Sequence, residues 1–182
     1  IEEWIKGRPF THKDLSDDTI KTIASMLARF HTMVGLNHND LSFVNILISD
    51  HNKIDLIDFE FAGKLNIYYD IANFFCEWIY DYESDDWYMY DLSLFPSYDE
   101  INIFCNAYIK SSHTPDLVCE DFINKIFDTM DAVHEFWVNW AEQTSKGDSK
   151  ITSYGEARSE LIGRDLKQVS LDNDNVRISR QI

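Results

Sequence analysis

The chain has 182 residues, 45% of them hydrophobic, and a formal net charge of −16 at pH 7. This length and apolar content predict one domain with one sizeable core, and the negative charge disfavours nucleic acids and anionic membrane surfaces as partners. Three cysteines without metal-ligand spacing, no signal-peptide pattern and no apolar run long enough for a transmembrane segment are typical of a cytoplasmic protein.

The first half of the chain predicts a strand, a helix and a hairpin. Residues 2–10 alternate loosely and end in Gly-Arg-Pro, which indicates a short strand that leaves into a turn. Residues 16–18 supply caps for a helix over 19–33, whose apolar residues recur at helical spacing. Two short strands are predicted at 45–49 and 53–57, joined by a tight turn.

The second half is predicted to be helical. A helix is expected over 70–80, and Asp70 is a candidate for its N-cap. A polar composition at the C-terminus predicts a flexible tail over 171–182. Together with the first half, this pattern predicts an α+β fold, mostly helical with a small β hairpin. Three amphipathic segments supply the remaining predicted helices: 98–110, 117–140 and 151–169.

Three polar residues around the predicted hairpin have the spacing of a phosphotransferase site. Asn45 follows Asp40 by five positions and Asp58 follows it by 18. Protein kinases carry this spacing as H-R-D-x-x-x-x-N followed by D-F-G, and here Asn39 replaces the Arg and Glu60 the Gly. In such sites the first carboxylate accepts a hydroxyl proton, while the amide oxygen and second carboxylate hold Mg²⁺. Taken singly, each half of the pattern is also consistent with a polar turn or an ordinary strand end.

Longer segments around these residues are more specific. They are His38-Asn39-Asp40 with Asn45, Ile57-Asp58-Phe59-Glu60-Phe61-Ala62, and Asp70-Ile71-Ala72-Asn73-Phe74-Phe75-Cys76-Glu77-Trp78. On these segments the chain resembles the choline/ethanolamine kinases, and the resemblance runs from Glu2 to Arg158.

The resemblance implies a protein kinase-like fold in which residues 1–170 are the C-terminal lobe and residues 1–10 the hinge between two lobes. It also implies ATP as co-substrate and Mg²⁺ as cofactor. In this interpretation the catalytic base is Asp40, the Mg²⁺ ligands are Asn45 and Asp58, and the supporting residues are His38, Glu60 and Asp70, whose carboxylate braces the catalytic loop.

The resemblance further implies an amine site made of Glu77, Tyr82, Trp137, Trp140 and Tyr154. Aromatic faces and a carboxylate suit a quaternary ammonium, which they hold by cation–π contact. Spacing alone favours a different interpretation, in which Glu77 is a solvated residue on a helix face and the two tryptophans belong to the core.

Two segments that are typical of the family are missing from this sequence. Only six residues, 32–37, stand where the family has a long, largely helical segment, and the six glycines of the chain form no Gly-rich phosphate loop. We therefore expect a C-terminal lobe without its N-terminal lobe, inactive alone.

The expected reaction of the full kinase is ATP-dependent phosphorylation of the hydroxyl of choline or ethanolamine, the first step of phosphatidylcholine and phosphatidylethanolamine synthesis. Two alternatives stay open: a non-catalytic choline-binding or partner-binding remnant, and a phosphotransferase for another small hydroxyl compound. A homodimer is compatible with the sequence.

Overall fold

A computed structural model describes residues 6–49, 53–112 and 118–180 of the chain. Its strands are β1 (Arg8–Pro9), β2 (Ile46–Ile48) and β3 (Ile54–Leu56). Three short 3-10 turns lie at His12–Asp14, Phe43–Asn45 and Leu92–Leu94. The helices are α1 (Asp17–Val34), α2 (Ile67–Glu77), α3 (Tyr98–Ser111), α4 (Cys119–Phe127), α5 (Met130–Thr144), α6 (Ser149–Ser159) and α7 (Leu166–Arg180).

The strands form one small antiparallel sheet in the order β1-β2-β3. Ile46 is opposite Leu56 in the β2–β3 pair, so the predicted hairpin is confirmed, and β1 extends it to three strands. Pro9 lies in the edge strand, where a missing N–H costs no interior ladder bond. The predicted turn between β2 and β3, and residues 1–5 of the predicted first strand, lie outside the described residues. The mostly helical α+β fold is thus confirmed.

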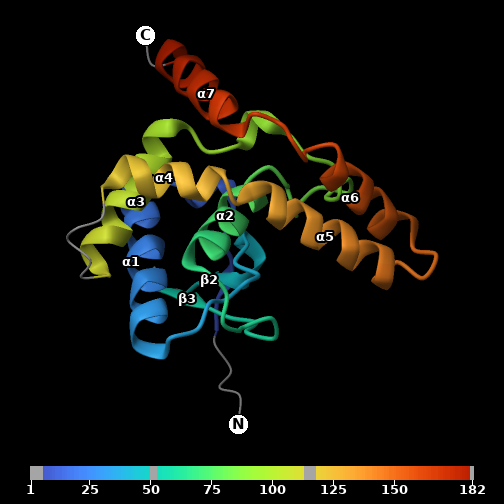
Figure 1. Ribbon diagram of the computed structural model, residues 1–182, viewed down its shortest axis with the longest axis horizontal. Helices are drawn as coiled ribbons and strands as arrows, with labels where there is room; N and C mark the ends of the chain where they lie inside the picture. The colour runs from blue at the N-terminus through green and yellow to red at the C-terminus, as the bar shows by residue number, and fades with distance from the viewer. Residues whose placement is uncertain (1–5, 50–52, 113–117, 181–182) are drawn as a thin grey trace.

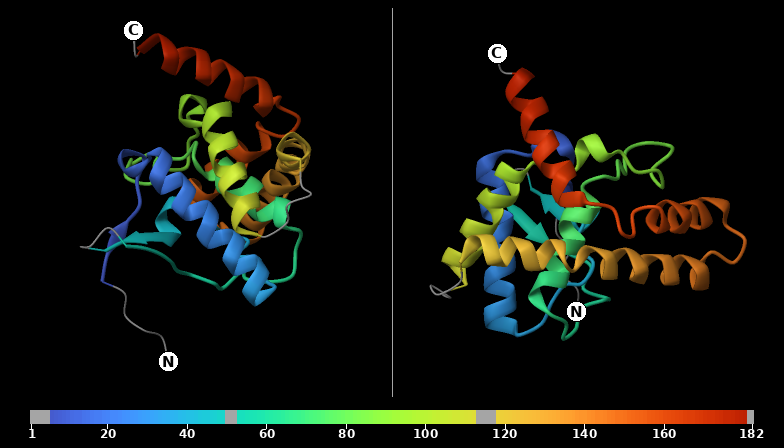
Figure 2. Two further views of the ribbon diagram at one scale, coloured as in Figure 1. Left: turned by 90° about the vertical axis from the view of Figure 1, so that its left-hand side faces the viewer. Right: turned by 45° about the horizontal axis from the view of Figure 1, so that its top comes forward.

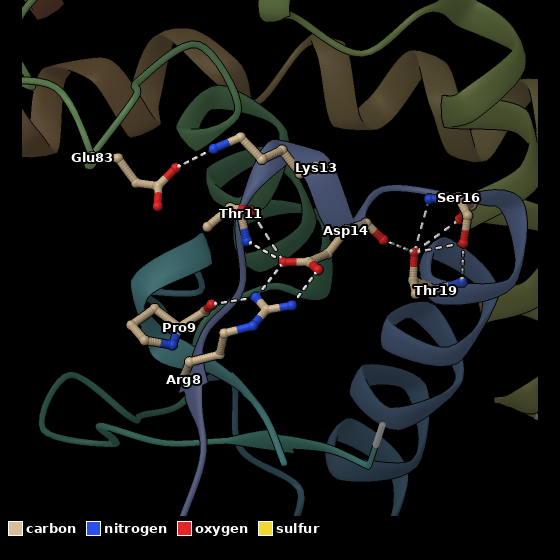
Figure 3. Close-up of polar contacts among 8 residues, drawn as sticks. All are labelled: Arg8, Pro9, Thr11, Lys13, Asp14, Ser16, Thr19 and Glu83. Carbon is tan, nitrogen blue, oxygen red and sulfur yellow. Dashed lines mark hydrogen bonds and ion pairs between the residues drawn. The ribbon is translucent and has the colours of Figure 1, made fainter. Parts of the chain in front are cut away.

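The chain enters the described region through a charged turn. The Arg8 guanidinium donates two hydrogen bonds, of 2.7 and 2.6 Å, to the Asp14 carboxylate (Figure 3). The same carboxylate accepts the Thr11 backbone N–H at 2.9 Å, and the Ser16 hydroxyl accepts the Thr19 N–H that begins α1. These contacts connect β1 to α1 through caps and one bidentate ion pair.

Helix α1 confirms the helix predicted over 19–33. Its buried apolar residues fall on one face, and Gly35 ends it with a left-handed φ of 70°, a conformation that glycine adopts without a Cβ penalty. That face packs on α3, on the left of Figure 1.

Helix α2 lies at the centre of the molecule, between the α1–α3 pair and the α5–α6 pair (Figure 1). It begins three residues earlier than predicted because Asn66, whose side chain accepts the Tyr68 N–H, is its N-cap. The N-cap role considered for Asp70 is therefore wrong: Asp70 lies inside the helix, fully buried. Every residue from Asp70 to Tyr80 is buried.

The later helices are shorter than predicted. The segment 117–140 divides into α4 and α5 around Asp128 and Thr129, and 151–169 divides into α6 and α7. Gly163, with a φ of 76°, lies in the turn between the latter two.

Helix α7 runs as far as Arg180 along one end of the molecule and so includes residues 171–180 of the predicted tail (Figures 1 and 2). The Asn173 side-chain amide ties this helix to the Leu92 and Phe95 carbonyls, at 3.1 and 2.8 Å. None of the helices in the described ranges is long and apolar enough to cross a membrane.

Helices α5 and α6 pack against each other unusually closely. A Cβ built on Gly155 would lie 2.8 Å from the Cβ of Ala141, so only glycine fits there.

His134 is a fully buried histidine on α5. The Arg158 guanidinium, on α6, donates to its Nδ1 at 3.3 Å. Burial lowers the pKa of His134 to about 4, although the charge of Asp131 opposes this shift.

We predict that Gly155→Ala destabilises the protein by about 1–3 kcal/mol, the usual cost of overpacking. Helix propensity alone would give the opposite sign, because alanine is favoured over glycine within a helix. Urea unfolding measures the change, with the exposed Glu156→Ala on the same helix as a control expected to stay within about 0.5 kcal/mol. A stabilised Gly155→Ala protein would contradict the close α5–α6 contact.

We also predict that His134 makes stability fall in mild acid. Its folded pKa of about 4 is below the value near 6.5 of an unfolded histidine, so the unfolded chain binds the extra proton between these pH values. Stability contributed by neutral His134 is complete above about pH 6.5 and is lost towards pH 4, by up to about 3 kcal/mol. Urea unfolding of wild type and His134→Gln between pH 7 and 4.5 should show the smaller pH slope in the variant. Equal slopes would refute the prediction.

Candidate active site

The loop that carries Asp40 is held by one buried carboxylate. Asp70 accepts the backbone N–H of His38 at 2.7 Å and that of Asn39 at 2.9 Å. It also accepts Nε2–H of His31, at 2.8 Å, since a carboxylate can only accept. These hydrogen bonds hold the backbone just before Asp40.

Asn39 adopts a left-handed φ of 64° within this loop. Asparagine tolerates this conformation better than most residues with a side chain, and at Asn39 surrounding contacts hold it. Here the contacts are the Asp70 bond to its N–H and a 2.9 Å bond from its side-chain amide to the Phe61 carbonyl.

The Asp40 side chain is partly buried and is held by Asn45. The Asn45 amide nitrogen donates to the Asp40 backbone oxygen at 2.9 Å and to its Oδ2 at 3.1 Å. Burial raises the pKa of Asp40 to about 7, and the charges of Asp58 and Glu60 add to this shift, while the Asn45 bond and the charge of Arg158 oppose it. A carboxylate with this pKa is suited to accept a proton near neutral pH.

Asp58 lies at the same end of the hairpin as Asn45. The Ile57 N–H donates to the Asn45 carbonyl at 3.0 Å, one step beyond the Ile46–Leu56 pair, so Asp58 follows directly. Nε2 of His38 contacts the Ile57 carbonyl at 2.8 Å and supports this turn. Asp58 itself has a left-handed φ of 62° and, like Glu60, is exposed.

The donor set at this end of the hairpin fits Mg²⁺. Asn45 offers an amide oxygen and Asp58 a carboxylate, and Mg²⁺ prefers such hard oxygen ligands. Within the described ranges, no three His, Cys, Asp or Glu side chains form a metal-binding group by themselves. Mg²⁺ is usually bound by one or two protein carboxylates and completes its shell with water and substrate phosphates.

Glu77 is buried, with 2% of its surface exposed, so its interpretation as a solvated residue is wrong. Its Oε1 forms an ion pair with the Arg158 guanidinium, and its Oε2 accepts the Tyr82 hydroxyl. Burial raises the pKa of the Tyr82 phenol, which therefore stays protonated and donates to Glu77.

The predicted aromatic residues lie together around Tyr154. Its ring centroid is 6.5 Å from that of Trp137 and 6.4 Å from that of Trp140, both edge-on. Tyr82 joins the group through Trp87, on which it stacks at 6.1 Å and which lies 5.9 Å from Tyr154.

The Asn73 side chain connects the aromatic group to the loop that carries Asp40. The Trp137 indole N–H donates to Asn73 Oδ1 at 2.7 Å, and the Asn73 amide donates to the Leu41 carbonyl at 3.2 Å. Trp137 is 5% exposed, so the core interpretation holds for it, while Trp140 is partly exposed. Burial raises the pKa of both Tyr82 and Tyr154, and the negative charge of Asp40 adds to this shift.

Sequence reasoning missed several residues of this region. Arg158 follows Tyr154 by four positions, and residues at that spacing share a helix face, which was the available signal. Asn73 follows Asp70 by three positions in the same way. Tyr80 and Trp87 had no comparable signal, because their contacts depend on the fold of the segment around them.

Comparison with known proteins supports the same family. The choline/ethanolamine kinase family matches residues 32–162. Probable choline kinase 3 of Arabidopsis thaliana is 38% identical over 112 residues, 59% of this chain and 32% of that protein. Probable choline kinase 1 of the same plant is 33% identical over 127 residues, 68% of this chain and 37% of that protein.

A choline/ethanolamine kinase of Rattus norvegicus is 28% identical over 139 residues, 68% of this chain and 35% of that protein. The chain thus spans about a third of the length of these relatives. Since the family match covers more than half of the sequence and includes Asp40, Asn45 and Asp58, the chain belongs to the choline/ethanolamine kinase family.

Proposed function

We propose that this chain is the C-terminal lobe of a kinase that phosphorylates the hydroxyl of choline, or of ethanolamine, with ATP. Residues 1–170 form the lobe in this proposal, and residues 1–10 the hinge towards a second lobe. The observation that carries it is the convergence of Asp40, Asn45 and Asp58 at one end of the β2–β3 hairpin, with an aromatic group connected to the Asp40 loop through Asn73.

Asp40 accepts the proton of the substrate hydroxyl as the oxygen attacks phosphorus. Asn45 holds the Asp40 carboxylate in one orientation through its amide N–H. Mg²⁺ held by the Asn45 amide oxygen and Asp58 would neutralise charge on the phosphates. The backbone is left-handed at Asn39, directly before Asp40, and at Asp58 itself.

The aromatic group binds the ammonium end of the substrate. Trp140 is the partly exposed ring of the pair that it forms with Tyr154, and the Tyr82 hydroxyl donates to Glu77. A methylated ammonium gains from aromatic faces and donates no hydrogen bond, whereas a primary ammonium loses hydration that these rings do not replace. Choline is therefore the preferred amine. A substrate with several amines would instead need carboxylates spread over the site. This difference disfavours a phosphotransferase for another small hydroxyl compound of that kind.

We predict that the chain binds choline more tightly than ethanolamine, and that Trp140→Ala weakens choline binding by about 1–2 kcal/mol, roughly fivefold to thirtyfold. Trp140 is only partly buried, so the change should leave the fold intact. Isothermal titration calorimetry measures both affinities. The matched control is Trp140→Phe, which keeps an aromatic face and should lose less. Equal affinities for the two amines, or no effect of Trp140→Ala, would argue against this site.

We predict that the 182-residue chain alone binds choline but does not turn it over. Phosphoryl transfer depends on many groups acting together, and a base with two metal ligands positions the γ-phosphate too loosely. A coupled assay for ADP release with Mg²⁺, ATP and choline tests this, with Asp40→Ala as the control. Robust choline-dependent turnover that disappears in Asp40→Ala would show that the lobe is active by itself.

A further inference from the structure

The proposed amine site already contains a cation that belongs to the protein. Arg158 is fully buried on α6, and its guanidinium forms an ion pair with Glu77 Oε1. The same guanidinium donates to the Tyr154 hydroxyl at 2.7 Å and to His134 Nδ1 at 3.3 Å. Burial lowers the pKa of Arg158 to about 10, so it remains charged at neutral pH.

The guanidinium also lies over the rings of two tyrosines. Its Cζ lies 4.6 Å from the Tyr80 ring centroid and 5.0 Å from that of Tyr154. These are cation–π distances, and the tyrosines that make them belong to or border the proposed amine site. Trp137 and Trp140 meet Tyr154 edge-on, and among the contacts described neither makes a cation–π contact with the guanidinium.

Arg158 changes what Glu77 can offer to a ligand. One carboxylate oxygen is paired with the guanidinium and the other accepts the Tyr82 hydroxyl. The Glu77–Arg158 pair is neutral as a unit, so the carboxylate supplies no net charge to an incoming ammonium. A primary ammonium depends on acceptors to replace the water that it loses, whereas a quaternary ammonium has no N–H to satisfy.

We propose that Arg158 is a positioning residue that sets amine specificity: by pairing with Glu77 and holding the Tyr154 hydroxyl, it makes the site favour a quaternary over a primary ammonium. This inference rests on the proposed function, because it assigns a preference to the same site. It assigns the ammonium contact to the aromatic rings and makes Glu77 a partner of Arg158 rather than the counter-ion of the ligand.

The experiment compares choline and ethanolamine affinities by calorimetry for wild type, Arg158→Met, Arg158→Lys and the double variant Glu77→Gln with Arg158→Met. Arg158→Met frees the Glu77 charge for N–H donors, so the choline-to-ethanolamine affinity ratio should shift about tenfold towards ethanolamine. Arg158→Lys keeps the charge and should keep the preference for choline. Arg164→Met is the matched control, because Arg164 is exposed with its Cζ 5.7 Å from the Tyr90 ring, and its ratio should not change.

The double variant keeps the test decisive if Arg158→Met fails to fold, since replacing both members of a buried ion pair avoids an unpaired charge. It should bind choline within about threefold of wild type, because the rings carry the contact. Loss of choline binding in a double variant with an unchanged thermal midpoint would identify Glu77 as the direct counter-ion and overturn the inference. An unchanged ratio in folded Arg158→Met would do the same. A wild-type chain that binds neither amine would instead overturn the proposed function itself.

Discussion

The arrangement of the candidate site depends on the fully buried carboxylate of Asp70. It accepts two backbone N–H groups of the loop before Asp40 and one imidazole N–H from α1. The Tyr108 hydroxyl, on α3, lies 2.7 Å from the other nitrogen of that imidazole, His31. A buried charge is tolerated only when it is this well satisfied, so α1, α2, α3 and the loop are fixed together by one group.

Helix α2 carries further buried polar side chains that are satisfied by hydrogen bonds or an ion pair. Asp70, Asn73 and Glu77 follow one another at intervals of three and four residues, so they share one face of a helix that is otherwise apolar. Asp70 holds the loop, Asn73 links Leu41 to Trp137, and Glu77 meets Arg158 and Tyr82. One polar stripe within the core thereby relates the position of the proposed base to the position of the proposed amine site.

Local patterns in the sequence predicted α1, the hairpin and the start of α3, because caps, apolar periodicity and turn residues lie within a few positions of one another. The division between α4 and α5 was not predictable in this way, since Asp128 and Thr129 are ordinary residues in a helix-like segment. The continuation of α7 depends on tertiary contacts, such as those of Asn173 with Leu92 and Phe95. Arg158 was missed for a related reason: its partner Glu77 is 81 positions away, and no local pattern joins them.

The burial of α2 also affects how its backbone amides open to solvent. Amides of a helix enclosed on all sides exchange with solvent through global rather than local opening, so the Asp70–Glu77 stripe should belong to the slowest-exchanging unit of the protein. The segment 81–90, by contrast, is largely exposed and contributes Tyr82 and Trp87 to the aromatic group. The proposed amine site therefore combines two residues of an exposed segment with an enclosed helix, and of these two elements the exposed segment should open locally at the lower free energy.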